Sequence, residues 1–274
     1  MRDKNNFISK IFNLKNRTIV LTGSSGLLGT QYSHTLSEAG ANVVLVDVDA
    51  KRNKKLESIL CQKYHTRPMS CNVDISNPSD VDQLTNDVLS EYGKIDGLIN
   101  NAMYNPRVNS QNVAVPFESF PHQIWEQTLA VNLTGVFSCS QKIGAVMAKQ
   151  KKGVIVNISS IYGIVGADQR IYGKSNLNSP VSYAVTKGAI INLTRYLAAY
   201  WHRKNIRVNT LSLGGVLDRT YQNKEFIKKY SERTMLGRMA NKEEYRGPLL
   251  FLVSDASSYM TGANLIIDGG WTAW

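Results

Sequence analysis

Short runs of β-branched and other apolar residues alternate along the chain with longer segments in which apolar residues recur every three or four positions. The short runs predict about seven strands, at Thr18–Leu21, Val43–Asp47, Met69–Val73, Gly97–Asn100, Val154–Ile158, Ile206–Leu211 and Leu265–Ile267. The longer segments predict about six helices, at Gly26–Ala39, Asp49–Cys61, Pro78–Tyr92, His122–Lys149, Tyr183–Trp201 and Lys242–Val253. Nearly continuous apolar strands are typical of sheets covered on both faces. The alternation therefore predicts an α/β fold with a doubly wound parallel sheet and helices on both faces.

The length of 274 residues suits one domain, and no linker divides the chain into halves. We expect an N-terminal extension at residues 1–15 and a single nucleotide-binding domain at residues 16–274. The first residues, MRDKNNFISKIFNLKNR, lack the apolar core of a secretory signal, and no stretch reaches the roughly 18 apolar residues that span a bilayer. A cytoplasmic protein with no membrane partner is the expectation.

A formal charge of +11 raises the question of a nucleic-acid partner. The basic residues are scattered, however, and no nucleic-acid-binding motif accompanies them, so a solvated surface is the better interpretation. Cysteines 61, 71 and 139 form no C-x-x-C pair and have no ligand-like spacing with the four histidines. We therefore expect no nucleic acid and no metal, with the cysteines as small buried side chains in a reducing compartment.

The segment TGSSGLLG (residues 22–29) joins the first predicted strand to the first helix, which is the context that gives a glycine motif meaning. Glycines allow a pyrophosphate to approach the backbone and the unpaired N–H groups at the helix start, although a plain tight turn is the alternative. The expected contacts are Gly23, Ser25, Gly26, Leu27 and Leu28. Asp47 follows Gly29 by about 18 residues, near the spacing of the acid that binds a ribose 2′-hydroxyl, so NAD is favoured and NADP is less favoured. Lys51 and Arg52 nearby moderate that preference.

Tyr183 and Lys187 are four residues apart on a predicted helix, so both side chains lie on one face. An ammonium and a cationic nicotinamide together lower the pKa of a phenol from its usual value near 10. The tyrosine could then exchange a proton with a carbinol oxygen while hydride moves to or from the cofactor. Ser159 lies just beyond a strand, where its hydroxyl could hydrogen-bond the reacting oxygen. Asn132 lies in a long helical segment and by itself is an ordinary polar helix residue.

From about Asn16 to Gly270 the chain resembles a short-chain dehydrogenase/reductase of the single-domain branch, with a Rossmann-type fold. The matching motifs are Asp74-Ile75, Asn100-Asn101-Ala102, the tetrad Asn132, Ser159, Tyr183 and Lys187, then Arg207-Val208-Asn209, Thr261-Gly262 and Asp268-Gly269-Gly270. The resemblance implies that Asn132 holds a proton-relay water and that Lys187 grips the nicotinamide ribose. It implies further cofactor contacts at Asp74, Ile75, Asn101, Ala102, Tyr183, Lys187, Gly214 and Val216. It also implies a homotetramer or homodimer.

The chain departs from the family pattern at several places. The glycines follow a TGxxGxxG spacing, Met103 replaces a glycine, Leu213 replaces a proline, and Asp218 stands where a threonine is common. Ser159 and Tyr183 are about 24 residues apart, a dozen or so more than usual. We expect this insertion to overhang the active site and to supply a polar rim. The predicted substrate-binding residues are Arg107, Tyr162, Arg170, Tyr172 and Lys174.

A rim rich in arginine, lysine and tyrosine suits a polyhydroxylated, anionic substrate. The insertion, the SGLLG loop and the Ile-Tyr-Gly after the serines resemble oxidoreductases of flagellin and surface-glycan modification, which serve legionaminic-acid-type sugars, and gluconate 5-dehydrogenase-like enzymes. The leading hypothesis is thus an NAD-dependent oxidoreductase acting on a sugar phosphate or nucleotide sugar. Two alternatives stay open: a reductase of another carbonyl substrate such as a 3-oxoacyl thioester, and a cofactor-binding regulator or scaffold without turnover.

Overall fold

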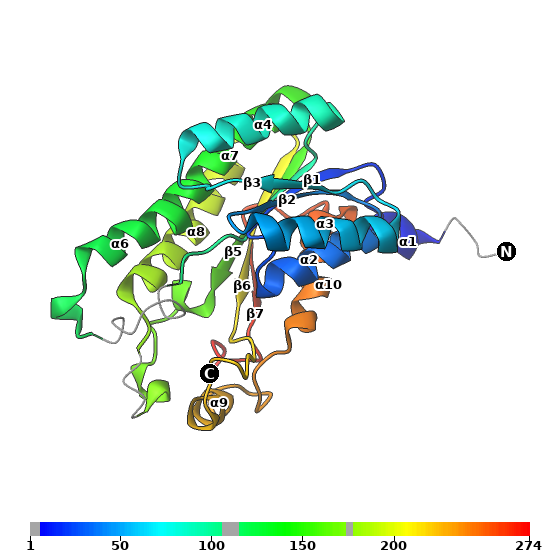
Figure 1. The fold of residues 1–274 in the computed structure, drawn as a ribbon. Helices are drawn as coiled ribbons and strands as arrows, with labels where there is room; N and C mark the ends of the chain where they lie inside the picture. The colour runs from blue at the N-terminus through cyan, green and yellow to red at the C-terminus, as the bar shows by residue number, and fades with distance from the viewer. Residues whose placement is uncertain (1–5, 106–114, 174–177) are drawn as a thin grey trace.

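Seven parallel strands form one sheet in the computed structural model, which describes residues 6–105, 115–173 and 178–274 (Figure 1). The strands are β1 (Thr18–Thr22), β2 (Asn42–Asp47), β3 (Met69–Asn72), β4 (Gly97–Asn100), β5 (Gly153–Ser160), β6 (Ile206–Leu213) and β7 (Asn264–Ile267). Their order is β3-β2-β1-β4-β5-β6-β7. The predicted fold class is confirmed, and every predicted strand is present with ends shifted by a few residues.

The strand order reverses between β1 and β4. The chain first builds outward from β1 to β3 and then returns to pair β4 with the free side of β1, with Val20 opposite Leu98. In open parallel sheets, such a reversal leaves a crevice at the carboxyl ends of the strands, where ligands bind. The residues that follow β1, β4, β5 and β6 are therefore candidates for ligand binding.

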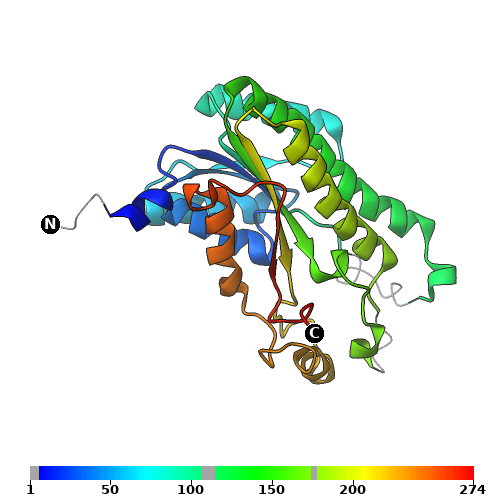
Figure 2. The same cartoon turned by 180° about the vertical axis from the view of Figure 1, so that it is seen from behind.

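Helices cover both faces of the sheet, as Figures 1 and 2 show from opposite sides. They are α1 (Phe7–Ile11), α2 (Leu27–Glu38), α3 (Ala50–Tyr64), α4 (Pro78–Tyr92), α6 (His122–Leu129), α7 (Val136–Gln150), α8 (Val181–Tyr200), α9 (Lys224–Ser231) and α10 (Arg246–Val253). Of the helices within the described part of the chain, none is long and apolar enough to cross a bilayer. The layers are those of the predicted doubly wound sheet.

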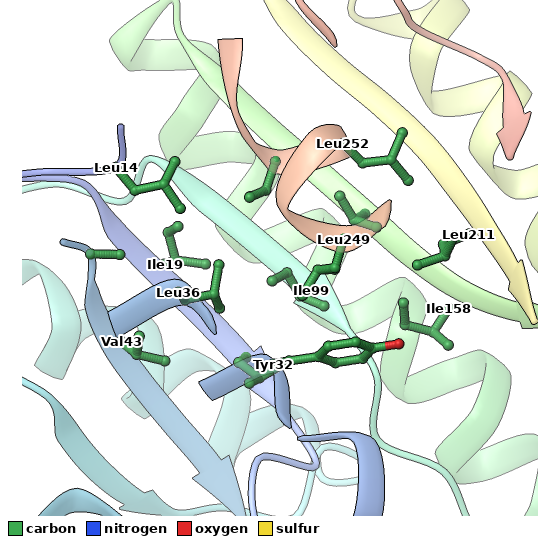
Figure 3. Packing of buried hydrophobic residues seen from close by; sticks show 14 of the residues in the cluster. Leu14, Ile19, Tyr32, Leu36, Val43, Ile99, Ile158, Leu211, Leu249 and Leu252 are labelled. Atoms are coloured by element: carbon green, nitrogen blue, oxygen red, sulfur yellow. The ribbon is translucent and has the colours of Figure 1, made fainter. Parts of the chain in front are cut away.

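Alternate residues of each central strand enter two separate cores. Ile19 of β1 lies in a core with residues of α2, α3 and α10, and Figure 3 shows it beside Leu36. Val20 enters the other core, which α4, α7 and α8 cover. Leu14 is fully buried in the first core, so the end of the predicted N-terminal extension packs against the domain. Burial on both faces explains why the strands read as continuous apolar runs.

Two predicted helices are interrupted, and two helices were not predicted. The segment His122–Lys149 contains a π-helical stretch, η2 (Ala130–Gly135), between α6 and α7. The segment Lys242–Val253 begins as a 3₁₀ turn, η5 (Lys242–Tyr245), before α10. The missed helices α1 and α9 have only five and eight residues, which is too short for a repeating apolar pattern to identify them.

The Arg207-Val208-Asn209 motif has a structural role. The Arg207 guanidinium donates to the backbone oxygens of Leu252 and Ser254, at 3.1 and 2.9 Å, and so satisfies carbonyls at the end of α10. The Asn209 amide donates to the oxygen of Met260 at 2.8 Å, which fixes the loop that enters β7. The motif therefore sets the position of the C-terminal segment at the edge of the sheet.

Candidate active site at the carboxyl edge of the sheet

The glycine loop after β1 packs directly on the turn after β4. Gly23 has a φ of +66°, and a Cβ there would lie 2.7 Å from Cα of Ala102, so this position requires glycine. The Asn101 side-chain amide donates to the backbone oxygens of Thr22 and Gly23, both at 3.0 Å. The Thr22 hydroxyl in turn accepts the N–H groups of Asn101 and Ala102, both at 3.0 Å. These bonds fix the loop at the strand reversal.

The first turn of α2 is open to an anion. Its N-cap residue, Gly26, provides no side-chain cap, and no acidic residue lies in the first turn. A Cβ at Gly29 would lie 1.9 Å from the oxygen of Gly23, so only glycine allows the helix to begin so close to the loop. The uncapped N–H groups around Leu27 and Leu28 suit a phosphate group. These residues fit the pyrophosphate of a dinucleotide.

Asp47 lies at the end of β2, beside this loop. One carboxylate oxygen accepts the N–H of Ser25 at 2.9 Å, and the other accepts the N–H of Asp49 at 3.1 Å. The Arg52 guanidinium donates to the backbone oxygen of Ser25 at 2.8 Å. An acid suited to a ribose diol and a cation suited to a 2′-phosphate therefore border the same loop.

The other predicted cofactor residues follow β3 and β6, at the same edge of the sheet. The Asp74 carboxylate accepts the N–H and the hydroxyl of Ser76, at 2.9 and 2.7 Å. Ile75 is buried. Gly214 packs against Asp268, since a Cβ there would lie 2.8 Å from Cα of Asp268. Val216 forms a parallel bridge with Ala240. The two pairs thus share the carboxyl edge of the sheet, with β2, β1, β4 and β5 between their strands.

Asn132 lies within the π-helical stretch η2 and is buried. Its side-chain oxygen accepts the N–H of Tyr104 at 2.7 Å, and its amide donates to the oxygen of Tyr104 at 3.0 Å. This pair of bonds ties the loop after β4 to the helix. Helical periodicity contains no sign of the π turn, so sequence reasoning from the residues alone had no reason to select Asn132.

Tyr183 and Lys187 lie in the first two turns of α8, and the Lys187 Nζ is 5.7 Å from the centroid of the Tyr183 ring. Lys187 is buried, and its Nζ donates to the backbone oxygen of Ile158 at 2.8 Å. Because burial disfavours the charged ammonium, the pKa of Lys187 falls to about 8. The predicted proximity of the phenol and the amine is present in the fold.

The two adjacent serines at the end of β5 have different surroundings. The Ser159 hydroxyl donates to the backbone oxygen of Lys187 at 2.7 Å and is buried, so its only hydrogen is already used. Ser160 points to the other side of the strand, and its oxygen accepts the N–H of Tyr162 at 3.2 Å. Ser160 keeps a hydroxyl hydrogen that it can donate. Sequence reasoning selected Ser159 and missed Ser160, although side-chain alternation was the available signal.

The insertion between the serines and Tyr183 is less polar at its surface than predicted. Tyr162 and Tyr172 are buried in an aromatic cluster with Tyr230 and Trp271, and they do not form a solvent-facing rim. The large area that aromatic rings bury explains this arrangement. Tyr172 also contacts Phe226 of α9, with ring centroids 5.3 Å apart.

The remaining predicted substrate residues are basic. Arg170 is exposed and pairs with Asp168, which also pairs with Arg233. Arg107 and Lys174 lie outside the described residues.

Between the insertion and the segment before α6 lies a largely apolar cavity of about 340 Å³, which Phe117 and Ala184 help to line. Across the described ranges, no cluster of His, Cys, Asp and Glu could hold a metal ion.

Comparisons with known proteins match nearly the whole chain. A family model described as enoyl-(acyl carrier protein) reductase matches residues 24–272. An NAD-dependent glycerol dehydrogenase of Listeria innocua is 32% identical over 271 residues, covering 96% of each chain. Post-translational flagellin modification protein A of Campylobacter coli is 30% identical over 258 residues, covering 94% of this chain and 99% of that protein.

A solved structure is similar over the same length. The gluconate 5-dehydrogenase of Burkholderia cenocepacia, in complex with NADP and tartrate, superposes with a TM-score of 0.86. It is 28% identical, and the superposition covers 97% of this chain and 99% of that one. The names of these relatives include both nicotinamide cofactors, so they leave the choice between NAD and NADP open.

Burial of Lys187 predicts a pH-dependent stability. Its pKa is about 8 in the folded chain and near 10.4 in an unfolded one, so between these values the unfolded chain binds more protons. This contribution to stability is complete above pH 10.4 and is lost as the pH falls to about 8. Between pH 7 and pH 10, wild type should gain roughly 2–3 kcal/mol relative to Lys187→Met. Urea unfolding of both proteins measures this gain, and a pH-independent difference would contradict it.

Proposed function

Since the chain belongs to the short-chain dehydrogenase/reductase family, we propose that it is an NAD-dependent oxidoreductase acting on a secondary alcohol or ketone of a sugar-like substrate. The observation that carries the proposal is the Tyr183 ring beside the buried Lys187 amine, on the helix that follows β5 at the edge where the glycine loop lies. That arrangement supplies an acid–base group next to a site that fits a dinucleotide.

When bound, the nicotinamide supplies hydride transfer, so that an alcohol and the oxidised cofactor give a ketone, the reduced cofactor and a proton. The Tyr183 phenolate takes that proton from the carbinol oxygen in oxidation, and the phenol returns it in reduction. The positive charge of Lys187 favours the phenolate form of Tyr183. Asn132 fixes the loop after β4, and the π-helical turn around it supports a water site, because such turns disrupt the regular hydrogen-bond ladder.

The substrate proposal rests on the relatives and on the charges near the insertion. Relatives named for glycerol and gluconate support a polyhydroxylated substrate, and the flagellin modification protein supports a role in surface-glycan biosynthesis. Arg170 and Arg233 share one carboxylate, that of Asp168, so one positive charge is in excess. This excess favours a phosphorylated or nucleotide-linked sugar. The roles of Arg107 and Lys174 in substrate binding stay predictions from the sequence.

We propose a homotetramer or homodimer in the cytoplasm, without a nucleic-acid or membrane partner. The support is the family together with two exposed aromatic side chains on α8: Tyr196 and Tyr200 stack with ring centroids 6.1 Å apart. Exposed aromatic residues are enriched at protein interfaces. Sedimentation velocity measures the assembly, and a monomer at micromolar concentration would contradict the proposal.

The family model description and the apolar cavity favour a second candidate, a reductase of an acyl thioester. An acyl chain suits an apolar cavity better than a polyol does. A panel of polyols, sugar phosphates and 3-oxoacyl thioesters, followed by NADH absorbance, separates the two. Turnover of thioesters alone would replace the sugar proposal with this candidate.

Tyr183→Phe tests catalysis itself. The change removes the hydroxyl that transfers the proton and keeps the ring. We therefore expect kcat for the substrate that wild type turns over to fall by roughly 10²–10⁴-fold. Binding of NADH, followed by its fluorescence, should stay within about twofold of wild type because the ring is retained. Turnover by Tyr183→Phe at the wild-type rate would show that Tyr183 is not the acid–base group, and NADH binding without turnover of any substrate by wild type would favour the cofactor-binding protein.

The serines make a matched pair. We expect Ser160→Ala to lower kcat more than Ser159→Ala, because only the Ser160 hydroxyl has a hydrogen to donate to the reacting oxygen. Ser159→Ala should mainly lower the melting temperature, since it removes a buried hydrogen bond between β5 and the backbone oxygen of Lys187. Steady-state kinetics and thermal unfolding of both variants distinguish these effects, and the opposite order would restore Ser159 as the substrate-facing serine.

The NAD preference depends on Asp47. We expect wild type to use NAD better than NADP, and Asp47→Ala to reverse that order, because the carboxylate repels a 2′-phosphate while Arg52 attracts it. The ratio of kcat/KM for the two cofactors measures the effect. Asp49→Ala removes a neighbouring acid that caps α3, so it controls for charge alone. A wild-type preference for NADP would show the proposal to be wrong.

A further inference from the structure

Two buried tyrosines hold the peptide between Gly214 and Gly215, directly after β6. The Tyr245 hydroxyl donates to the backbone oxygen of Gly214 at 3.1 Å. The N–H of Gly215 donates to the hydroxyl oxygen of Tyr230 at 2.5 Å. Both tyrosine side chains are almost fully buried. The carbonyl and the N–H of this one peptide group are therefore each bound by a side chain from elsewhere in the chain.

The two tyrosines come from elements on either side of the loop. Tyr230 is in α9, and its ring lies 4.4 Å from that of Trp271, centroid to centroid. Tyr245 ends the 3₁₀ turn η5 and lies in the core with α10. A Cβ at Gly215 would lie 2.5 Å from Cζ of Tyr230, so the contact requires glycine. Burial raises the pKa of both phenols, which therefore stay protonated.

The loop needs such support because of its sequence. Two consecutive glycines have the greatest backbone freedom of any dipeptide. Leu213 precedes them, at the position where the resemblance implies a proline, and proline would restrict the backbone there. Backbone bonds from Gly214 to Ile267 and from Ala240 to Gly215, at 2.9 and 3.0 Å, fix the loop only in part.

We propose that Tyr230 and Tyr245 are positioning residues that hold the Gly214–Gly215 peptide in the shape required by the nicotinamide end of the cofactor. Their hydrogen bonds restrict the loop, as a proline at position 213 would. This inference rests on the proposed function, because it requires a nicotinamide at this edge of the sheet. Tyr230 also joins the loop to α9, which packs on the insertion through Phe226 and Tyr172. The insertion and the cofactor loop are thus parts of one packed unit.

The test compares NADH with ADP-ribose, which has the adenine and pyrophosphate but no nicotinamide. Equilibrium titrations of wild type, Tyr230→Phe and Tyr245→Phe measure both dissociation constants. We expect each variant to bind NADH about 3- to 10-fold more weakly, the effect of one neutral hydrogen bond, and to bind ADP-ribose as wild type does. Tyr259→Phe, the same change at a fully exposed position, should alter neither constant.

A second variant separates positioning from general loss of structure. Leu213→Pro in the Tyr230→Phe background should recover most of the lost NADH affinity, because it restricts the loop by another route. Equal weakening of NADH and ADP-ribose, or unchanged NADH affinity in both tyrosine variants, would overturn the positioning role. If wild type binds neither compound, the proposed function fails, and this inference fails with it.

Discussion

The junction between β5 and α8 is the constraint on which the site depends. The Lys187 Nζ donates to the backbone oxygen of Ile158, and the Ser159 hydroxyl donates to the backbone oxygen of Lys187, so strand and helix are bonded in both directions. The cost of burying an amine is offset only where such a partner exists. Helix α8 therefore has one favourable position on the sheet, and this position determines where Tyr183 lies.

Buried polar groups extend this junction across the sheet. The Asn157 amide donates to the Thr194 hydroxyl of α8 at 2.9 Å, and the Asn100 amide donates to the Asn157 oxygen at 2.8 Å. Because an unpaired polar group in a core is costly, these bonds fix the relative positions of β4, β5 and α8. The same end of β4 binds the glycine loop through Asn101. The proposed catalytic and nucleotide-binding residues thus share one rigid frame, and the two tyrosines bind the loop after β6 to it.

Much of the fold and part of the site could be predicted from local patterns. Continuous apolar runs identified the strands, and the distance of four residues between Tyr183 and Lys187 placed both on one helix face. Gly23 and Gly29 lie where a Cβ would collide with backbone, and the predicted approach of a pyrophosphate to this loop stays a prediction. The apolar runs and the spacing of Tyr183 and Lys187 depend on chemistry within a few residues, so they can be recognised from the order of amino acids.

What the sequence by itself determined is therefore the doubly wound sheet, the glycine loop after the first strand and the position of Tyr183 and Lys187 on one helix. Only the tertiary structure decided which serine keeps its hydroxyl hydrogen, because that depends on the backbone oxygen of Lys187 on another element. It also decided that Tyr162 and Tyr172 are buried, since the aromatic partners Tyr230 and Trp271 come from distant segments. The π turn at Asn132 and the tyrosines beside Gly214 and Gly215 belong to the same class. Each depends on contacts between elements that are distant in the sequence, and the pattern of apolar and polar residues does not indicate such contacts.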